Sequence, residues 1–584
     1  METVSFRTKL LLCALAVVAY GAGLFVTVMD IDAAQYASMS RFVAESKDFW
    51  TALLQPHGYL DKPPLLFFVS ALSIKVLGPS TFAYKLPSFL IVVLGIFATF
   101  RLGKLLYDKR TGILAAVVLG SSEGFIYFTN DVRTDALLAG AVIFSVWQLT
   151  EFLYSGRVRY FFGGFFGVGL AMLAKGPIGL MVPALAIGSY LAGKRDFKMF
   201  FKWYWSVGAL IVGAMLAPML RGLYMQYGLH GIKFFFWTQS FGRITGQSSW
   251  HDASGYFFFV HTFLWAFAPW MLLAYYSIGE HAVSLVRGRF GDARAPDMLL
   301  LGGAVFPFVA LSCSHYKLPH YIFVIFPLVA ILTAKTVLRL VNDARAARAY
   351  TIFFRIQRVV SILTWVFALV CITLFFPCAQ PVVWLLVCAG AGGTFYLLSS
   401  KHSRFVRLVL PSVCAILGLN IMINIYFFPR LLSFQGGSNA AASVKRNGIP
   451  VDSLYGFRAR NNAIEFYTGR ELPVLDSAHI FEKMSKEKFW IYADRDGYRL
   501  LARSSRLLFP VDSFPNVHVA KITGKFLFFK TRPASIGEQY IIRTEPLPVH
   551  SDSGAIHFQQ GILQNKAATQ RTTIMSLGKI ALDI

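Results

Sequence analysis

The sequence predicts an all-α polytopic membrane protein with a small C-terminal α/β domain. Only 15% of the residues are charged, whereas about a quarter are charged in an average soluble protein. Apolar runs of about 17 to 25 residues, long enough to cross a bilayer as helices, recur between Leu10 and Phe428. After Phe428 the pattern changes to short strand-like and amphipathic segments. The bilayer is therefore the expected solvent for most of the chain.

Counting apolar runs between charge clusters predicts about thirteen spans. They lie near residues 10–28, 86–100, 112–128, 136–154, 160–175, 177–192, 204–227, 256–278, 297–313, 319–338, 357–376, 380–398 and 406–428. With a cytoplasmic N-terminus, every even-numbered turn is basic, as the positive-inside rule requires. The apolar segment Leu65–Gly78 is short for a span, so we expect a helix at the outer membrane surface; the alternative is a short tilted span.

The net charge of +26 does not indicate a nucleic-acid partner. The basic residues form short clusters between apolar runs, which is typical of membrane topology, and they make no single basic face. The six cysteines lie in or beside apolar runs without CxxC spacing, so neither a disulfide framework nor a thiolate metal site is expected. We interpret the first apolar run as a retained helix, because it lacks a small-residue cleavage pattern.

Three regions are predicted. Residues 1–430 form the transmembrane part, with 29–85 as a first outer loop carrying surface helices. Residues 431–548 form an α/β domain, which an odd number of spans places outside the cytoplasm. Residues 549–584 are expected to be a loosely ordered tail. The elements expected in the α/β domain are 454–457, 462–468, 472–476, 479–486, 489–493, 499–504 and 517–530.

Ionisable residues collect in the predicted outer turns, which indicates a polar cavity there because such groups are costly at a membrane boundary. They include Asp30, Asp32, Asp61, Lys62, Asp131, Arg133, Asp135, Lys175, Arg243, His315, Lys317 and His320. Cations suit a leaving phosphate, and a carboxylate suits the orientation or deprotonation of an acceptor hydroxyl. Any single residue could instead cap a helix or snorkel to water, and snorkelling is as good an explanation for Lys317. A transporter for an anionic solute would show a similar inventory.

The chain resembles bacterial members of the protein O-mannosyltransferase and aminoarabinose (lipid A) transferase superfamily. The resemblance extends from the first span to about Tyr321 and rests on the order and spacing of several motifs. These are Asp32 with Tyr36, YLDKPP, KLPS at Lys85–Ser88, RTDALL, the AKGP turn and KLPHYI. It implies a GT-C fold and an inverting glycosyltransferase that uses a polyprenyl-phosphate sugar.

The resemblance also implies roles for individual residues. Asp32 and Asp135 correspond to acidic catalytic positions, and Lys62, Arg243 and Tyr321 to positions that bind the carrier phosphate. Further possible substrate-binding residues are Tyr36, Tyr59, Asp61, Asp131, Lys175 and Lys317. The family usually has a Glu beside the first Asp and an Arg soon after it, whereas this chain has Ala33 and Gln35. Asp32 is then the sole carboxylate of that motif.

The expected partners are a polyprenyl-phosphate-linked sugar, a glycolipid or protein acceptor, and the lipid bilayer. The expected location is the bacterial cytoplasmic (inner) membrane, with the site and the C-terminal domain on its outer side. No obligatory metal is expected, because the histidines lack tight ligand spacing; a divalent ion stays open. The alternative function is a transporter or flippase of an anionic lipid-linked substrate, although the repeats common in transporters are not visible in the sequence.

Overall fold

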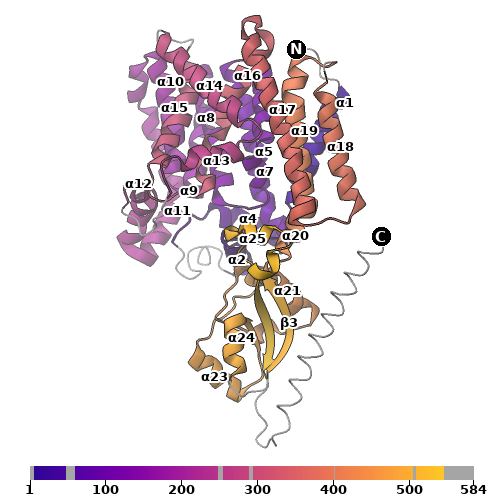
Figure 1. The fold of residues 1–584 in the computed structure, drawn as a ribbon. Helices are drawn as coiled ribbons and strands as arrows, with labels where there is room; N and C mark the ends of the chain where they lie inside the picture. The colour runs from indigo at the N-terminus through magenta and orange to yellow at the C-terminus, as the bar shows by residue number, and fades with distance from the viewer. Residues whose placement is uncertain are drawn as a thin grey trace, which may run out of the picture. The chain divides into compact units, whose positions relative to one another are not determined.

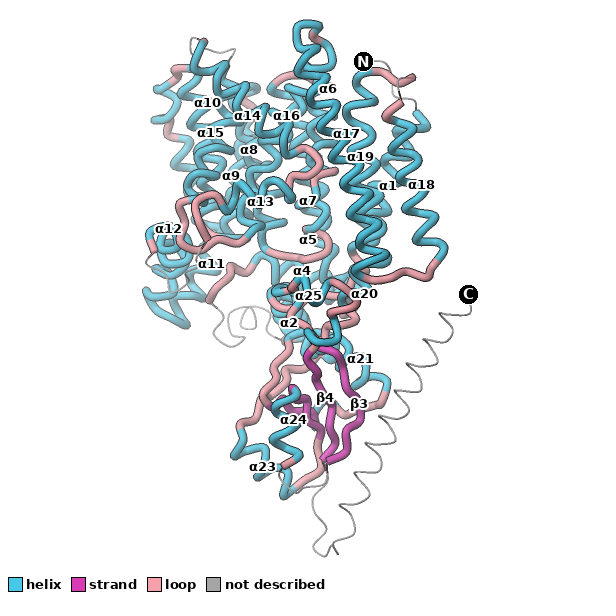
Figure 2. Tube along the Cα trace, in the orientation of Figure 1, coloured by secondary structure: helices cyan, strands magenta, loops and turns pink. Residues whose placement is uncertain are grey.

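The computed structural model describes residues 6–47, 60–246, 254–288, 294–399, 401–503 and 508–544. The described part of the chain consists mainly of helices, and its strands all belong to one C-terminal sheet (Figure 2). It divides into two compact units. The larger comprises Met1–Asn447, Asn461–Glu471 and Phe514–Gly537, and the smaller comprises Gly448–Arg460, Leu472–Ser513 and Glu538–Ile584.

The first half of the larger unit is a series of helices. They are α1 (Phe6–Gly23), α2 (Asp32–Glu45), α4 (Leu65–Leu77), α5 (Thr81–Leu106), α6 (Lys109–Gly120), α7 (Glu123–Tyr127), α8 (Thr134–Ser155), α9 (Val158–Lys175), α10 (Ile178–Lys194) and α11 (Tyr204–Lys233). Local sequence explains several of their ends. The Ser80 side chain accepts a hydrogen bond from the first turn of α5, and Asp108 does the same for α6. Gly156 ends α8 in the left-handed region.

The second half of this unit continues in the same way. Its helices are α12 (Gly242–Thr245), α13 (Phe258–Ala266), α14 (Met271–Arg287), α15 (Ala295–Ser312), α16 (Phe326–Asn342), α17 (Ala347–Val370), α18 (Pro381–Leu397), α19 (Arg404–Met422), α20 (Phe428–Leu432), α21 (Gly436–Arg446), α22 (Asn462–Thr468) and α25 (Gly524–Leu527). A 3-10 segment, η4 (Pro319–Ile325), leads into α16. Three further turns have π-helical geometry, at Phe234–Phe241, Cys371–Phe375 and Ile423–Phe427.

Each of the predicted spans coincides with one helix or with two consecutive helices. Within the described residues, seven helical stretches are long and apolar enough to cross a membrane. They are Thr81–Leu106, Thr134–Ser155, Tyr204–Gln239, Ala295–Ser312, Pro319–Asn342, Ala344–Phe375 and Arg404–Leu432. Leu65–Leu77, Ile178–Lys194 and Pro381–Leu397 are shorter apolar helices. The number of crossings stays a prediction.

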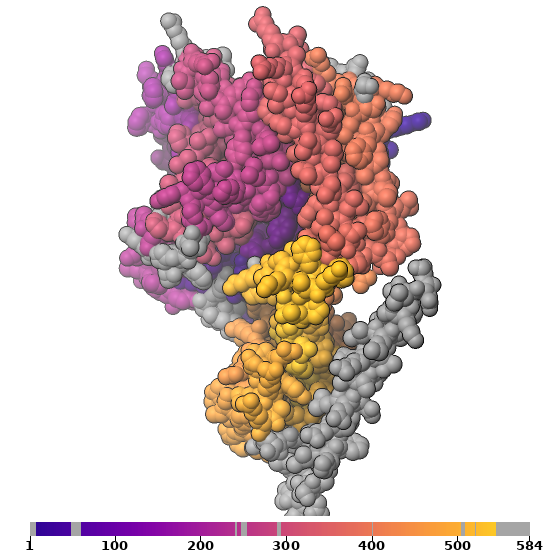
Figure 3. Space-filling model, in the orientation of Figure 1, coloured from indigo at the N-terminus to yellow at the C-terminus, as the bar shows by residue number. Residues whose placement is uncertain are grey.

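The most buried long helices of the bundle are α16, α19 and α8. The most apolar window of Pro319–Asn342 is 94% buried and that of Thr134–Ser155 is 78% buried, so both stretches lie inside the protein and not against lipid. In the space-filling view, later helices cover most of the early ones (Figure 3). Close packing requires glycine at some contacts, because a Cβ on Gly140 would lie 2.6 Å from the backbone oxygen of Ile91.

Helices α2 and α4 lie together at one end of the bundle, and the N-terminus lies at the other (Figure 1). The Tyr36 ring of α2 meets the Phe67 ring of α4 edge-on, with 5.8 Å between centroids. Ser70 of α4 donates a hydrogen bond of 3.1 Å to the carbonyl of Tyr84 in α5. The segment expected to be a surface helix is thus a helix, and it fixes the start of α5.

The smaller unit is built on a four-stranded sheet with strand order β1-β2-β4-β3. The strands are β1 (Leu454–Phe457), β2 (Trp490–Asp494), β3 (Leu508–Asn516) and β4 (Gly537–Thr544). β1 is parallel to β2, and β2 is antiparallel to β4. Two helices accompany the sheet, α23 (Ser477–Lys486) and α24 (Arg495–Ala502), and the side chains of Asp476 and Asp494 cap them.

Two expectations for the C-terminal region differ from the structure. Leu472–Asp476 forms only a single bridge, between Gly456 and Val474. Val517–Lys530 contains short helical turns and belongs to the larger unit, where Arg532 anchors the following turn. The Arg532 guanidinium lies 4.0 Å from the centroid of the Phe376 ring and donates to the carbonyl of Phe526 at 3.0 Å.

Candidate functional site

The turn between α1 and α2 is held by side chains from far along the chain. The Gln435 amide donates to the carbonyl of Val28 and accepts from the amide of Asp30, both at 2.9 Å. Asn461 donates to the Asp30 carboxylate at 3.1 Å. Burial raises the pKa of Asp30 to about 6, and the Asn461 hydrogen bond only partly opposes this effect. Hydrogen bonds from Asn461 and to Gln435 therefore fix Asp30 in the turn before α2.

Asp32, the first residue of α2, is paired with Arg133, which immediately precedes α8. The Arg133 Nε also donates to Asp131 at 2.6 Å, and Tyr127 donates to the same Asp131 oxygen at 3.1 Å. The Asp32 side chain remains 39% exposed, whereas those of Arg133 and Asp131 are 17% and 5% exposed. Asp32 is thus an oriented anion that a second molecule can still reach.

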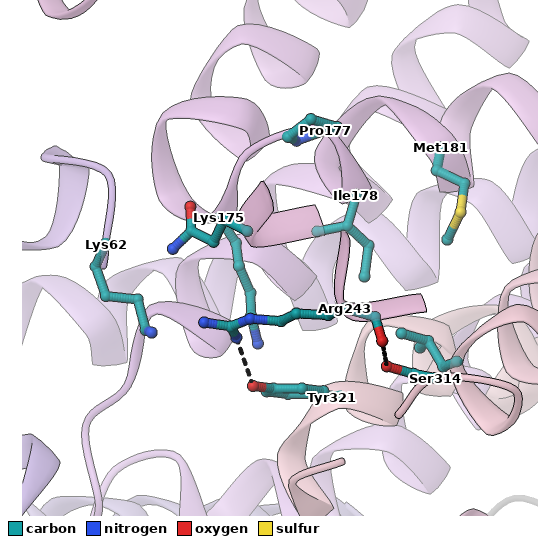
Figure 4. A pocket seen from close by; sticks show the side chains of 10 residues that line it. Lys62, Lys175, Pro177, Ile178, Met181, Arg243, Ser314 and Tyr321 are labelled. Atoms are coloured by element: carbon teal, nitrogen blue, oxygen red, sulfur yellow. Dashed lines mark hydrogen bonds between the residues drawn. The ribbon is translucent and has the colours of Figure 1, made fainter. Parts of the chain in front are cut away.

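Three cationic side chains converge on one cavity (Figure 4). Lys62 comes from the loop before α4, Lys175 from the last turn of α9, and Arg243 from α12. Tyr321 of η4 contacts two of them: its hydroxyl accepts from Arg243 Nη1 at 3.0 Å, and the Lys175 Nζ lies 3.8 Å from its ring centroid. One tyrosine therefore orients two cations.

Two carboxylates partly neutralise these cations. Asp61 pairs with Lys62 and accepts from Arg243 Nη2 at 2.8 Å. Burial alone would raise the pKa of Asp61, but the adjacent Lys62 and Arg243 charges outweigh burial and hold this pKa below its ordinary value. Asp135 pairs with Lys175. Since the cations outnumber the carboxylates, the cavity retains a positive excess that suits an anionic group.

The remaining walls of the cavity are mostly apolar. They are formed by Pro177, Ile178, Met181, Leu311, Gln239 and Ser314. The empty space measures about 720 Å³, including space open to the exterior. The Ser314 hydroxyl donates to the carbonyl of Arg243 at 3.1 Å and so fixes the backbone that carries the guanidinium (Figure 4). An amphipathic ligand with a phosphate head and an apolar chain matches this lining.

His320 lies close to charged residues of both the Asp32 cluster and the cation cavity. Its Nε2 is 3.6 Å from the second oxygen of Asp135, and the charges of Arg133, Lys175 and Lys62 all act on its ring. The two clusters are therefore neighbours. The structure brings Asp32, Lys62, Asp131, Asp135, Lys175, Arg243 and Tyr321 into one region.

Other candidate residues are placed differently. Tyr36 is buried against Phe67 and does not line the cavity. Lys317 donates to the carbonyl of Ser254 at 3.0 Å and is also absent from the lining. Tyr59 lies outside the described residues.

Lys85, from the KLPS motif, is 1% exposed, and its contacts are with backbone carbonyls and not with the cavity. Its ammonium donates to the carbonyls of Gly23, Val26 and Asn130 at 2.7 to 3.1 Å. It thereby joins the end of α1 to the turn before α8. A buried ammonium with three acceptors is stabilised by those contacts and lies away from the cavity.

No specific role was predicted from the sequence for Arg133, His320, Gln239 or Ser314. Arg133 and His320 stand inside the motifs RTDALL and KLPHYI. Their closeness in sequence to Asp135 and Tyr321 was a signal that could have marked them as site residues. Gln239 and Ser314 have no such signal, because only the tertiary fold brings them to the cavity. Within the described ranges, no three His, Cys, Asp or Glu side chains are placed to hold a metal ion.

Comparisons with known proteins show what parts of this chain are similar to. Residues 61–221 match the family model of dolichyl-phosphate-mannose-protein mannosyltransferases. The undecaprenyl phosphate-alpha-4-amino-4-deoxy-L-arabinose arabinosyl transferase of Edwardsiella ictaluri is 26% identical over 320 residues, which cover 53% of this chain and 56% of that protein. The enzyme of the same name from Pseudomonas aeruginosa strain PAO1 is 25% identical over 326 residues, with 53% and 56% covered. The chain thus spans about half the length of the curated relatives it matches.

The solved structures show the fold. The crystal structure of ArnT from Cupriavidus metallidurans bound to undecaprenyl phosphate matches with a TM-score of 0.72 and 17% identity, covering 93% of this chain and 100% of that chain. The apo form of that protein gives the same TM-score. The protein is therefore a polytopic helical membrane protein with the GT-C fold, which confirms the predicted fold class. Over part of its length the chain is similar to aminoarabinose transferases and to protein mannosyltransferases.

Proposed function

We propose that this protein is a glycosyltransferase that moves a sugar from a polyprenyl-phosphate carrier to an acceptor of the cell envelope. The observation that carries the proposal is the convergence of Lys62, Lys175 and Arg243 on a cavity with apolar walls. A lipid-linked sugar phosphate needs both features, because its phosphodiester is anionic and its prenyl chain is apolar.

In the proposed reaction, the three cations bind the carrier phosphate and stabilise the charge that develops on it as it leaves. The bond between the anomeric carbon and the phosphate oxygen breaks while the acceptor oxygen attacks from the opposite face. This single displacement inverts the configuration and needs no glycosyl-enzyme, unlike a retaining glycosidase. Asp135 holds Lys175 in place, and Asp61 does the same for Lys62 and Arg243.

Asp32 is the group that we assign to the acceptor. Its carboxylate is oriented by Arg133 yet partly exposed. If the acceptor is a hydroxyl, Asp32 takes its proton as the new bond forms; if the acceptor is a phosphate, which is already anionic, Asp32 orients it. The carrier we propose is undecaprenyl phosphate, in view of the names of the arabinosyl transferase relatives. The acceptor we propose is a lipid A-like glycolipid or a protein.

The proposed location is the inner membrane of a bacterium, with the N-terminus in the cytoplasm. The site and the α/β domain would then face the outer side. This orientation is supported by the basic clusters of the even-numbered turns. It also places the carrier phosphate in the outer leaflet, next to envelope acceptors.

Transfer of labelled sugar tests the proposal. Membranes that contain the wild type or Asp32→Asn are supplied with undecaprenyl-phosphate sugars, and label is followed into glycolipid and protein fractions. We expect label in one fraction with the wild type and at least a tenfold loss with Asp32→Asn at equal expression. Equal labelling by both proteins, across several sugars, would remove the proposed site.

A further inference from the structure

An apolar groove runs along one face of α10, between this helix and α8, α9 and α11. The α10 residues that line the groove recur every three or four positions, as Leu180, Pro183, Ala184, Ile187, Gly188 and Leu191. About 17 Å of helix separates Leu180 from Leu191, at 1.5 Å per residue, which is close to half of the roughly 30 Å hydrocarbon core of a bilayer. The groove therefore has about the length of one leaflet.

The groove is open to the surface of the bundle along its rim. Its floor consists of the buried side chains of Leu149, Phe165 and Val168, whereas Leu180 and Phe200 on its rim are 44% and 40% exposed. Its empty space measures about 590 Å³, including space open to the exterior. None of the described residues that line it is charged. An apolar chain is therefore the ligand that this lining suits.

A basic and aromatic segment, residues 194–203, closes one end of this groove. It contains the 3-10 turn η1 (Phe197–Phe201), which follows the end of α10. Phe200 of η1 lies against α10, because a Cβ on Gly188 would be 3.7 Å from its ring. Trp205, whose indole donates to the carbonyl of Met199 at 2.7 Å, also lines the groove. The segment is thus fixed beside the apolar lining.

The segment has an excess of positive charge. It carries one carboxylate, Asp196, and four basic residues, Lys194, Arg195, Lys198 and Lys202. Asp196 accepts from the backbone of η1 at 3.3 Å as its cap, and the Lys194 ammonium lies 5.3 and 5.7 Å from the centroids of two tyrosine rings. The side chains of Arg195, Lys198 and Lys202 are exposed and have neither an ion pair nor a hydrogen bond with any described residue. These three cations are therefore available to an anion.

The exposed aromatic side chains place this segment at a membrane surface. Phe201 and Trp203 are 90% and 75% exposed, and the combination of aromatic and basic side chains is typical of the headgroup region. Helix α10 begins at Ile178, which lines the candidate site, and about 24 Å of helix leads from there to Lys194. The segment therefore belongs to the leaflet opposite that of the candidate site, which is the cytoplasmic one in the proposed orientation.

We propose that the groove binds one acyl chain of an anionic phospholipid, and that Lys198 and Lys202 bind the phosphate of its headgroup. The groove supplies the apolar contact and the segment supplies the charge, so both parts of one lipid are matched. Basic sites between transmembrane helices on the cytoplasmic side bind such headgroups. A free phosphate ion would use the lysines alone and would leave the groove without a ligand. The proposal does not depend on the reaction at the candidate site.

Photolabelling of the purified full-length protein in detergent tests this inference. The probe is phosphatidylglycerol with a photoreactive group in one acyl chain, and mass spectrometry measures the label on residues 183–205 across a titration. None of these described residues lines the candidate site, so a lipid bound there does not contribute. We expect half-saturation at a concentration at least tenfold lower than with the same probe made from phosphatidylcholine. Glycerol phosphate, which lacks acyl chains, should compete at least tenfold less well than unlabelled phosphatidylglycerol, because it buries no apolar surface.

Variants test the charge and the groove separately. Lys198→Gln and Lys202→Gln should each raise the half-saturating concentration about fivefold, because each cation near the surface contributes about that factor. Lys109→Gln is the matched control, since Lys109 is an exposed lysine of another basic turn, and it should have no effect. Gly188→Leu puts a side chain into the groove and should raise the half-saturating concentration at least tenfold. Gly213→Leu, where nothing lies within 4 Å of the added Cβ, should leave it unchanged.

Melting temperatures check that each variant is folded, and the exposed lysine variants test the proposal even where Gly188→Leu lowers the melting temperature. Equal half-saturation by the two lipid probes would overturn the proposal, and so would competition by glycerol phosphate as strong as that by phosphatidylglycerol. Unchanged labelling of folded Gly188→Leu, or a loss with Lys109→Gln equal to that with Lys198→Gln, would also contradict it.

Discussion

Arg133 holds Asp32 across 101 residues of sequence, and the same guanidinium also donates to Asp131 at 2.6 Å. The turn before α2 is thereby joined to the turn before α8. Two carboxylates share one cation, so the Asp32 side chain has a fixed direction, while 39% of it remains exposed. An acceptor that approaches Asp32 therefore meets a preoriented anion.

Arg133 should be required for turnover more than for donor binding. Arg133→Lys keeps the charge but cannot hold both carboxylates, because an ammonium lacks the planar fork of a guanidinium. We expect both Arg133→Lys and Arg133→Gln to lower kcat by about 10- to 100-fold, with the donor KM within about twofold of the wild type. Steady-state kinetics with purified donor checks this, and an unchanged kcat in both variants would contradict it.

Tyr321 should act through both its hydroxyl and its ring. Tyr321→Phe removes the acceptor of Arg243 but keeps the ring beneath Lys175, and we expect about a fivefold rise in donor KM. Tyr321→Leu removes the ring as well and should raise the donor KM further, by about another fivefold. Donor titrations of both variants measure the difference. Equal KM values for Phe and Leu would show that the Lys175 contact contributes nothing.

Lys85 should matter for stability and not for donor binding. Lys85→Met leaves the carbonyls of Gly23, Val26 and Asn130 without their donor, at a cost of about 2 to 4 kcal/mol for three buried hydrogen bonds. We expect a melting temperature several degrees lower and an unchanged donor KM for the folded fraction. A raised donor KM with normal stability would instead place Lys85 in the site.

Asp30 should make stability dependent on pH. Its pKa in the folded protein, about 6, lies above the ordinary value of 3.8, so the folded state favours the protonated form. The stabilisation of the folded state by protonated Asp30 is fully present below pH 3.8 and is lost as pH rises to about 6. Asp30→Asn removes the penalty and should be more stable at pH 8, by up to about 3 kcal/mol.

Melting temperatures of the purified protein from pH 5 to 8 check the Asp30 prediction. The wild type should lose stability between about pH 5 and 6.5, whereas Asp30→Asn should show a flatter profile over that interval. Because Asn461 can still hydrogen-bond to an amide at position 30, the variant should fold normally. Identical profiles for the two proteins would show that Asp30 is not buried as described.

Long apolar runs made the helices predictable, because their length alone selects a helix in a bilayer. The helix Asn462–Thr468 also has its predicted bounds, since Asn461 caps it. The strands Leu508–Asn516 and Gly537–Thr544 were not predicted. The first contains two prolines and alternates poorly, and the second depends on pairing with Trp490–Asp494, far away in sequence.

The candidate site was predictable where a motif carries the side chain directly to the cavity, as for Lys62, Arg243 and Tyr321. The candidate site was less predictable where the role of a residue depends on the direction in which its side chain points. Lys317 stands four residues before Tyr321, yet its ammonium reaches Ser254. Tyr36 stands one helical turn after Asp32, yet its ring packs on Phe67. Sequence spacing places a residue near a site, whereas only tertiary packing decides where its side chain points.

The central claim is that Lys62, Lys175 and Arg243 bind the carrier phosphate. The most direct measurement is the equilibrium affinity of purified protein for undecaprenyl phosphate, for the wild type, Arg243→Ala, Lys62→Ala and the control Lys317→Ala. We expect Arg243→Ala and Lys62→Ala to bind about tenfold or more weakly, since each loses a charge-assisted hydrogen bond. Lys317→Ala should bind like the wild type. Unchanged affinity in Arg243→Ala and Lys62→Ala, with both variants folded, would contradict the assignment of this cavity.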